Sequence, residues 1–248
     1  MTWVLLRGLT REARHWESFK NQFEERLAPD TVTALDLPGN GTFYQLPSPM
    51  SVSAMVDFAR QQLLKLGDKP PYKLLAMSLG GMVATSWAER YPDEVDRLVL
   101  INTSMRPISG MTDRLRLRNW PQLGLLAARW QDADHAERTI HQLTCNQTAQ
   151  RDEDLMQWRQ IRKSAPVSSA NALRQLLAAA QFTCAEQTPR CPALVLSSGA
   201  DQLVNPVCST QLAKAWQAEH RSHPWAGHDL PHDDAQWLVE QVASWLTG

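Results

Sequence analysis

Residues 72–81 read YKLLAMSLGG, and this stretch decides how the rest of the chain is interpreted. The run YKLLAM has the apolar, β-prone character of a short buried strand, and the residues after Ser78 suit a helix. Ser78 therefore lies at a predicted strand-to-helix junction, with Gly80 and Gly81 two and three positions after it. The order resembles the G-x-S-x-G pattern, in which a sharp turn exposes a serine hydroxyl, except that Ala76 replaces the first glycine.

Short β-rich runs alternate with helical patterns on both sides of this junction, which predicts βα units around a largely parallel sheet. Most of the runs are almost continuously apolar, as expected for strands covered on both faces. We therefore predict an α/β fold with a mostly parallel sheet flanked by helices. The predicted strands are 2–8, 31–38, 72–77, 97–104, 192–199 and 220–225, and the predicted helices are 52–66, 80–90 and 233–246. The apolar stripe expected on the first helix consists of Val52, Met55, Val56, Ala59, Leu63 and Leu66.

The stretch from 105 to 190 differs from the rest, because arginines, glutamines and tryptophans occur among helical patterns and no strand is evident. We predict a helical cap insertion here, with 1–104 and 191–248 forming the core. No flexible linker interrupts the stretch, so its helices should pack on the sheet and roof a mostly apolar cavity. The apolar residues available for this are Leu123, Leu125, Leu126, Trp130, Leu155, Trp158, Leu173, Leu176 and Leu177.

Composition limits the classes of partner. The chain has 248 residues and a formal net charge of -1, and its basic residues are scattered, so neither nucleic acid nor an anionic membrane is favoured. The opening MTWVLLRG is too short for a signal peptide, and no stretch approaches the roughly 20 apolar residues that span a bilayer. We expect a cytoplasmic protein with a small-molecule partner, and composition does not indicate an oligomeric state.

The cysteines indicate no metal chemistry. Cys145, Cys184, Cys191 and Cys208 fall in no CxxC motif and in no Cys/His cluster along the sequence. An even number of cysteines does not by itself establish disulfides. We therefore expect reduced structural thiols, no zinc site and no cofactor.

A serine hydroxyl becomes a useful nucleophile only when a base takes its proton and a carboxylate orients that base. In a parallel sheet such groups collect on loops after the carboxyl ends of strands. Asp201 follows one predicted strand in GADQLVNP, and His228 precedes the last helix in WAGHDLPHDD. The chain order Ser78, Asp201, His228 is the serine, acid, histidine order expected when such a site lies on this type of parallel-sheet fold. Backbone N–H groups of Leu9, in LLRGLT, and Leu79 are candidates for an oxyanion hole.

Each of these residues also has a structural interpretation. Ser78 could cap a helix, and Asp201 could cap a turn. His223 and His232 compete with His228, although their positions in the last strand and at the start of the last helix favour structural or surface roles.

Several segments together resemble the α/β-hydrolase superfamily over essentially the whole chain. They are LLRG (5–8), DLPGNG (36–41), AMSLGG (76–81), GADQLVNP (199–206) and AGHDLP (226–231). The resemblance implies a serine esterase that forms an acyl-enzyme, similar to small carboxylesterases and the pimeloyl-acyl-carrier-protein methyl esterase group. A lyase of the menaquinone-pathway type and a non-catalytic binding protein remain alternatives.

One departure from the family pattern concerns charge. Arg7 replaces the histidine that the family often has before the oxyanion glycine. Arg7, Arg11 and Arg14 could meet an anionic substrate, although we expect Arg11 and Arg14 to be solvated.

Overall fold

A computed structural model describes residues 1–248 and contains one six-stranded sheet. The strand order is β2-β1-β3-β4-β5-β6, and every neighbouring pair is parallel. The strands are β1 (Thr2–Leu6), β2 (Thr31–Leu35), β3 (Tyr72–Met77), β4 (Val95–Ile101), β5 (Ala193–Ser198) and β6 (Glu219–His223). The predicted α/β fold with a mostly parallel sheet is confirmed.

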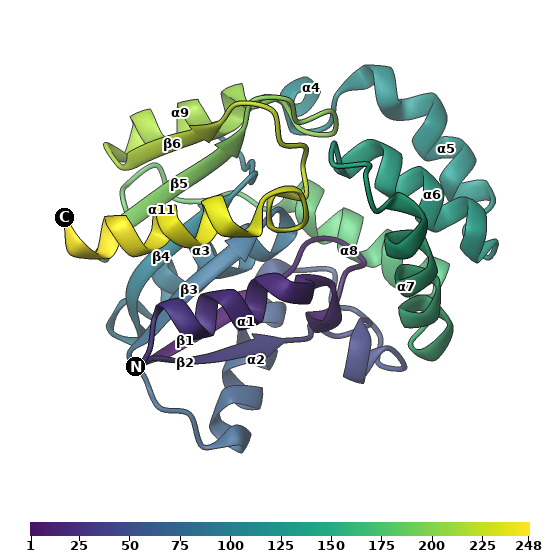
Figure 1. The fold of residues 1–248 in the computed structure, drawn as a ribbon. Helices are drawn as coiled ribbons and strands as arrows, with labels where there is room; N and C mark the ends of the chain where they lie inside the picture. The colour runs from purple at the N-terminus through teal and green to yellow at the C-terminus, as the bar shows by residue number, and fades with distance from the viewer.

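Helices cover both faces of this sheet (Figure 1). They are α1 (Glu17–Arg26), α2 (Val52–Leu66), α3 (Leu79–Arg90), α9 (Val207–Trp216), α10 (Leu230–Asp233) and α11 (Ala235–Thr247). One apolar cluster of 30 buried residues joins the sheet to α2, α3 and α9, and a second of 17 joins it to α1 and α11. Neighbouring strand residues such as Leu74 and Leu75 enter different clusters, because successive side chains of a strand point to opposite faces.

The ends of several elements differ from the predictions. Strand β4 ends at Ile101, three residues before the predicted end, because Asn102 adopts a positive φ of 46° that leaves the extended conformation. Helix α2 has the predicted bounds and ends at Gly67, whose φ is 83°. The predicted apolar stripe on α2 is buried except for Leu66, which is 64% exposed, so the stripe stops one turn before the helix does. The last predicted helix, 233–246, corresponds to α11, which begins at Ala235, and Asp233 instead ends the short helix α10.

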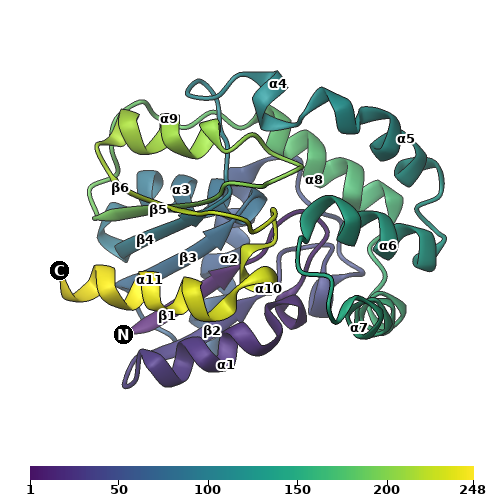
Figure 2. The ribbon, with the colours of Figure 1, turned by 45° about the horizontal axis from the view of Figure 1, so that its top comes forward.

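Between β4 and β5 the chain forms helices, and we call residues 105–190 the helical segment. Its helices are α4 (Met111–Arg114), α5 (Trp120–Ala128), α6 (Ala133–Thr144), α7 (Arg151–Ser164) and α8 (Ser169–Gln181). Figure 2 shows α5 to α8 gathered beside the sheet, on the side away from the two chain ends. Strand β1 starts next to the amino terminus, on the far side of the sheet from these helices. Because all the strands are parallel to β1, they run toward these helices. The helical segment therefore lies over the carboxyl ends of the strands.

Two further observations concern the whole chain. No helix combines the length and the apolar character that crossing a bilayer requires. All four cysteines are buried as free thiols.

Candidate active site

Ser78 occupies a strained turn between β3 and α3. Its φ of 52° and ψ of −119° are unusual for a residue with a side chain. Two contacts hold this backbone: the Ser78 N–H donates to the Ile101 carbonyl at 3.0 Å, and the Thr103 hydroxyl donates to the Ser78 carbonyl at 2.8 Å. The Ser78 side chain makes no capping hydrogen bond to α3, so the alternative of a simple helix cap does not describe it.

Close packing explains the glycines of the turn. A Cβ on Gly80 would lie 2.4 Å from the Leu6 carbonyl oxygen, and one on Gly81 would lie 2.7 Å from the Thr103 hydroxyl. The close approach of α3 to the end of β1 therefore requires Gly80, and its close approach to Thr103, just after β4, requires Gly81. Ala76, which replaces the first glycine of the pattern, is fully buried in β3, and the sharp turn forms with its methyl group present.

Asp201 and His228 are in direct contact although they lie on different loops. Asp201 Oδ2 is 2.7 Å from His228 Nδ1, and both residues are buried. Asp201 Oδ1 accepts the N–H groups of Leu203 at 2.8 Å and Val204 at 3.0 Å. These bonds fix the direction of the carboxylate, which in turn fixes the ring of His228 and leaves its Nε2 as the atom free for chemistry.

Asn102, the residue after β4, holds the loop that carries His228 in place. The Asn102 amide donates to the His228 carbonyl at 2.8 Å, and its oxygen accepts the Ser198 N–H at 2.8 Å. Burial acts to lower the pKa of His228, but the carboxylates of Asp201 and Asp229 outweigh it and raise the pKa above its ordinary value. The imidazole is therefore poised to accept and hold a proton.

Arg7 and Asp229 form a buried ion pair beside His228. The two guanidinium nitrogens of Arg7 lie 3.0 and 2.5 Å from the two oxygens of Asp229. Burial acts to raise the pKa of Asp229, but Arg7 holds it below its usual value, so this carboxylate stays charged. The pair joins the loop after β1 to the histidine loop. Arg7, the departure noted in the sequence, thus contacts the residue next to His228.

A cavity of about 120 Å³ brings the predicted site residues together, since Ser78 and His228 both line it. Asp201 lies behind His228 and does not line it. The Ser78 hydroxyl makes no hydrogen bond to His228 in this structure, and such contacts often tighten only when substrate binds. The remaining lining residues are Arg7, Gly8, Leu9, Thr10, Arg11, Met77, Leu123, Leu126, Trp130, Ile140, Leu143, Thr144, Leu203 and Asp229.

The roof of the cavity differs in part from the prediction. Of the apolar residues expected to line it, Leu123, Leu126 and Trp130 do so. Leu155 and Trp158 are buried elsewhere in the helical segment. The other four face solvent on α5 and α8 and are at least 37% exposed: Leu125, Leu173, Leu176 and Leu177.

The two predicted oxyanion donors belong to the loop after β1 and to the start of α3. Leu9 lines the cavity, and its N–H has no acceptor in the structure. The preceding Gly8 packs closely on the turn at Ser78, because a Cβ on Gly8 would lie 3.1 Å from Ser78 Cβ. Leu79 is the first residue of α3, a position whose N–H has no acceptor within the helix.

The buried charges at this end of the sheet include residues that sequence reasoning placed wrongly. Arg11 was expected in solvent, but it is 7% exposed and lies 2.7 Å from Glu137 of α6. Arg14 is half exposed. The cysteines form no Cys/His cluster along the sequence, but in the fold Cys145 lies beside His141 and His232. The H-x3-C spacing of His141 and Cys145 was visible, but His232 approaches them only through the fold.

The other histidine that competed with His228 has a structural role. His223 is buried at the end of β6, where its Nδ1 accepts the Ala226 N–H at 3.0 Å. It does not line the cavity.

Comparison with known proteins gives the family. Residues 4–235 match the alpha/beta hydrolase fold family, so the chain belongs to it. A pimeloyl-[acyl-carrier protein] methyl ester esterase from Klebsiella pneumoniae is 29% identical over 177 residues, covering 68% of this chain and 62% of that protein. The corresponding esterase from Chromobacterium violaceum is 35% identical over 92 residues, covering 37% of this chain and 34% of that protein. The chain spans 18% and 38% of two uncharacterized relatives, from Schizosaccharomyces pombe and Bacillus subtilis.

Solved structures share the fold at low sequence identity. A thermophilic esterase from Thermogutta terrifontis has a TM-score of 0.78 and 22% identity, covering all of this chain and 89% of its own. The enol-lactonase from Burkholderia xenovorans LB400 has a TM-score of 0.81 and 18% identity, covering all of this chain and 91% of its own. The chain is therefore an α/β-hydrolase in fold and in family, and its named relatives are hydrolytic enzymes.

Proposed function

We propose that this chain is a serine hydrolase that cleaves a carboxylic ester, with Ser78 as nucleophile, His228 as base and Asp201 as the acid that orients it. The observation that carries the proposal is the 2.7 Å contact between Asp201 and His228 at a cavity that His228 shares with the strained Ser78 turn. A binding protein would not need a serine on a strained turn beside a histidine oriented by a carboxylate. Membership of a hydrolase family supports the same interpretation.

The proposed reaction has two halves. Ser78 Oγ attacks the ester carbonyl carbon while His228 Nε2 takes its proton, and the N–H groups of Leu9 and Leu79 stabilise the oxyanion. Each donor contributes roughly 2.7–4 kcal/mol when it is aimed at that oxygen. The C–O bond to the alcohol then breaks, and the alcohol leaves with the proton from His228. Water, deprotonated by His228, attacks the acyl-enzyme and releases the acid and free Ser78.

Arg7 and Asp229 act as positioning residues in this scheme. Their buried ion pair ties the loop that carries the Leu9 N–H to the loop that carries His228. Because Asp229 already neutralises Arg7, we infer that Arg7 fixes the distance between these loops and that it does not bind a substrate anion.

The substrate is a small-molecule ester whose acyl part is short to medium in length. The proposal rests on the small volume of the cavity and on its roof of Leu123, Leu126 and Trp130 from the helical segment, which acts as a cap insertion. Two relatives are named pimeloyl-[acyl-carrier protein] methyl ester esterase. Because a methyl ester releases methanol, these names support an ester with a small alcohol.

Hydrolysis of p-nitrophenyl acetate and butyrate tests the proposal. We expect the wild-type protein to turn over both esters, Ser78→Ala to lose the activity, and the control Ser53→Ala, at an exposed serine of α2, to keep it. Equal activity in Ser78→Ala would remove Ser78 from the reaction. A folded wild-type protein inactive on activated esters, thioesters and lactones would instead favour the lyase or binding alternative.

A further inference from the structure

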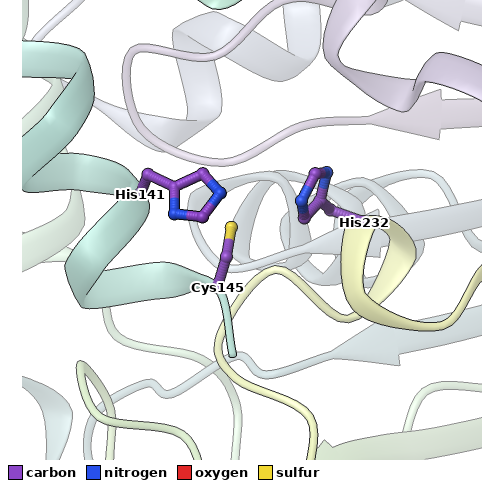
Figure 3. A group of neighbouring side chains, drawn as sticks. All are labelled: His141, Cys145 and His232. Atoms are coloured by element: carbon purple, nitrogen blue, oxygen red, sulfur yellow. The ribbon is translucent and has the colours of Figure 1, made fainter. Parts of the chain in front are cut away.

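A second cluster of reactive side chains lies outside the cavity. His141 is on α6, Cys145 directly follows that helix, and His232 is on α10. His141 and Cys145 are buried, and the side chain of His232 is 5% exposed. Figure 3 shows the two imidazole rings on either side of a gap, with the thiol of Cys145 pointing toward the same space, and the ring planes are nearly perpendicular, at 79°. None of the three lines the active-site cavity.

The donor atoms of this cluster match the preference of zinc. One ligand atom from each of the three residues lies within 4.8 Å of the other two. Around tetrahedral Zn²⁺, with bonds of about 2.0–2.3 Å to nitrogen and sulfur, neighbouring ligand atoms are roughly 3.3–3.7 Å apart. Side-chain rotations that move each atom by about 1 Å would therefore close the cage. One thiolate and two imidazoles form a donor set that selects zinc over magnesium or calcium.

The surrounding carboxylates complete the arrangement. Glu17 Oε2 lies 3.1 Å from His232 Nδ1, and Trp158 Nε1 donates to the other oxygen of Glu17 at 2.6 Å. This contact orients the ring so that Nε2 is the atom left for a metal, and His232 Nε2 has no hydrogen-bond partner. Asp154 Oδ2 is 3.4 Å from His141 Nε2 and 3.3 Å from His232 Nε2. These separations are long for charged hydrogen bonds but equal those between neighbouring zinc ligands.

The charges of the cluster also suit a cation. None of its three members hydrogen-bonds to an arginine or lysine, while Glu17 and Asp154 contact His232 directly. These two carboxylates bring negative charge to the side of the cluster where His232 lies.

We propose that His141, Cys145 and His232 bind one structural zinc ion, with Asp154 as the nearest carboxylate available for the fourth position. The ion would join the end of α6 in the helical segment to α10, which follows the His228 loop directly. It takes no part in ester cleavage, because no ligand faces the cavity. The sites for chemistry and for metal are thus close in sequence, at His228 and His232, but no proposed zinc ligand lines the cavity.

Zinc content tests this proposal without any activity measurement. Untagged protein is treated with EDTA, incubated with excess ZnCl₂, freed of unbound metal by gel filtration and analysed by elemental mass spectrometry. We expect about one zinc per wild-type chain and a higher melting temperature in the zinc-loaded form, because a ligand that binds only the native state stabilises it. Cys208→Ser, at a buried cysteine of α9, should bind the same amount, and Cys145→Ser and His141→Gln should lose it.

Zinc in Cys145→Ser equal to that in wild type would overturn the proposal, as would wild-type protein that retains none. If Cys145→Ser does not fold, the absorption spectrum of cobalt(II) bound to the wild-type protein decides whether Cys145 is a ligand. Thiolate ligation produces an intense near-ultraviolet charge-transfer absorption, which we expect. A cobalt complex with only weak visible bands would exclude Cys145 as a ligand and contradict the assignment.

Discussion

The core and the helical segment differ in what stabilises each of them. In the core, apolar clusters of 30 and 17 buried residues fix the sheet and the helices on its two faces, and the larger cluster also includes Met105, Ala178 and Cys184 of the helical segment. The apolar cluster within the helical segment contains only Leu126, Trp130 and Ala136 as buried members. Non-directional apolar packing over many residues tolerates the loss of one contact better than a few polar joints do.

Polar joints attach the helical segment to the core in addition to these few apolar contacts. Glu137 of α6 lies 2.7 Å from Arg11 and 2.5 Å from Arg162, and all three side chains are largely buried. Gln175 of α8 accepts the Thr10 N–H at 2.8 Å. The core thus holds Ser78, Asp201 and His228 in place, and under the proposed function the helical segment, with its smaller apolar cluster, would select what reaches them.

The largest expected effect concerns the core loops. Asp201→Asn should lower kcat/KM by up to ~10⁴-fold, because the amide no longer holds the reactive tautomer of His228, and His228→Ala should lose about as much activity as Ser78→Ala. Steady-state kinetics with melting temperatures as a folding control measure this. Activity of Asp201→Asn within a factor of about three of wild type would move the acid role to another residue.

The next largest effect concerns the joint at Glu137. Glu137→Gln leaves Arg11 and Arg162 without their buried partner, which costs about 3–5 kcal/mol in comparable sites. Because the joint is local, we expect faster limited proteolysis within residues 105–190 before global unfolding in urea. Glu153→Gln, at an exposed position of α7, is the matched control and should leave the pattern unchanged. Identical cleavage of the two variants would mean that this joint does not hold the segment.

A smaller effect concerns pH. His228 must be neutral to act as a base, and its raised pKa places the acid limb of kcat/KM above about pH 6.5, the ordinary value for histidine. Asp229→Asn removes a carboxylate that raises this pKa and leaves Arg7 charged nearby, so the limb should move to lower pH. Profiles from pH 5 to 9 compare the variant with wild type. An unchanged limb would show that Asp229 does not influence the base.

The smallest effect concerns acyl length and tests the roof. Among p-nitrophenyl esters, each methylene that fits should contribute up to ~0.8 kcal/mol until the cavity is full, which favours roughly C2–C8 acyl groups. Trp130→Ala, which removes part of the roof, should extend the range to longer chains. If kcat/KM of the wild type still rose at C16, the cavity would be an open groove and the roof would have no selective role.

The sequence predicted the core better than the helical segment. All six strands and the turn at Ser78 follow from local composition, and the positions of Asp201 and His228 follow because a parallel sheet gathers its strand ends at one edge. Arg11 and His232 could not be placed in this way. Their burial depends on Glu137 and Glu17, partners far away in the sequence that only tertiary packing brings near.

The same limit applies to the cavity roof. Apolar character alone did not separate Leu126, which lines the cavity, from Leu125, which is 51% exposed on the other side of α5. Short helices with few buried residues carry too weak a periodic pattern to fix which side faces the core.

Covalent labelling of Ser78 tests the central claim most directly. A fluorophosphonate reacts with a serine only where a base and an oxyanion hole activate it, so the mass of one adduct, mapped by peptide sequencing, identifies the nucleophile. We predict a single adduct on Ser78, none on Ser78→Ala, and strongly slowed labelling of His228→Ala. Labelling of Ser78→Ala at the wild-type rate, or an adduct on a different serine, would contradict the account.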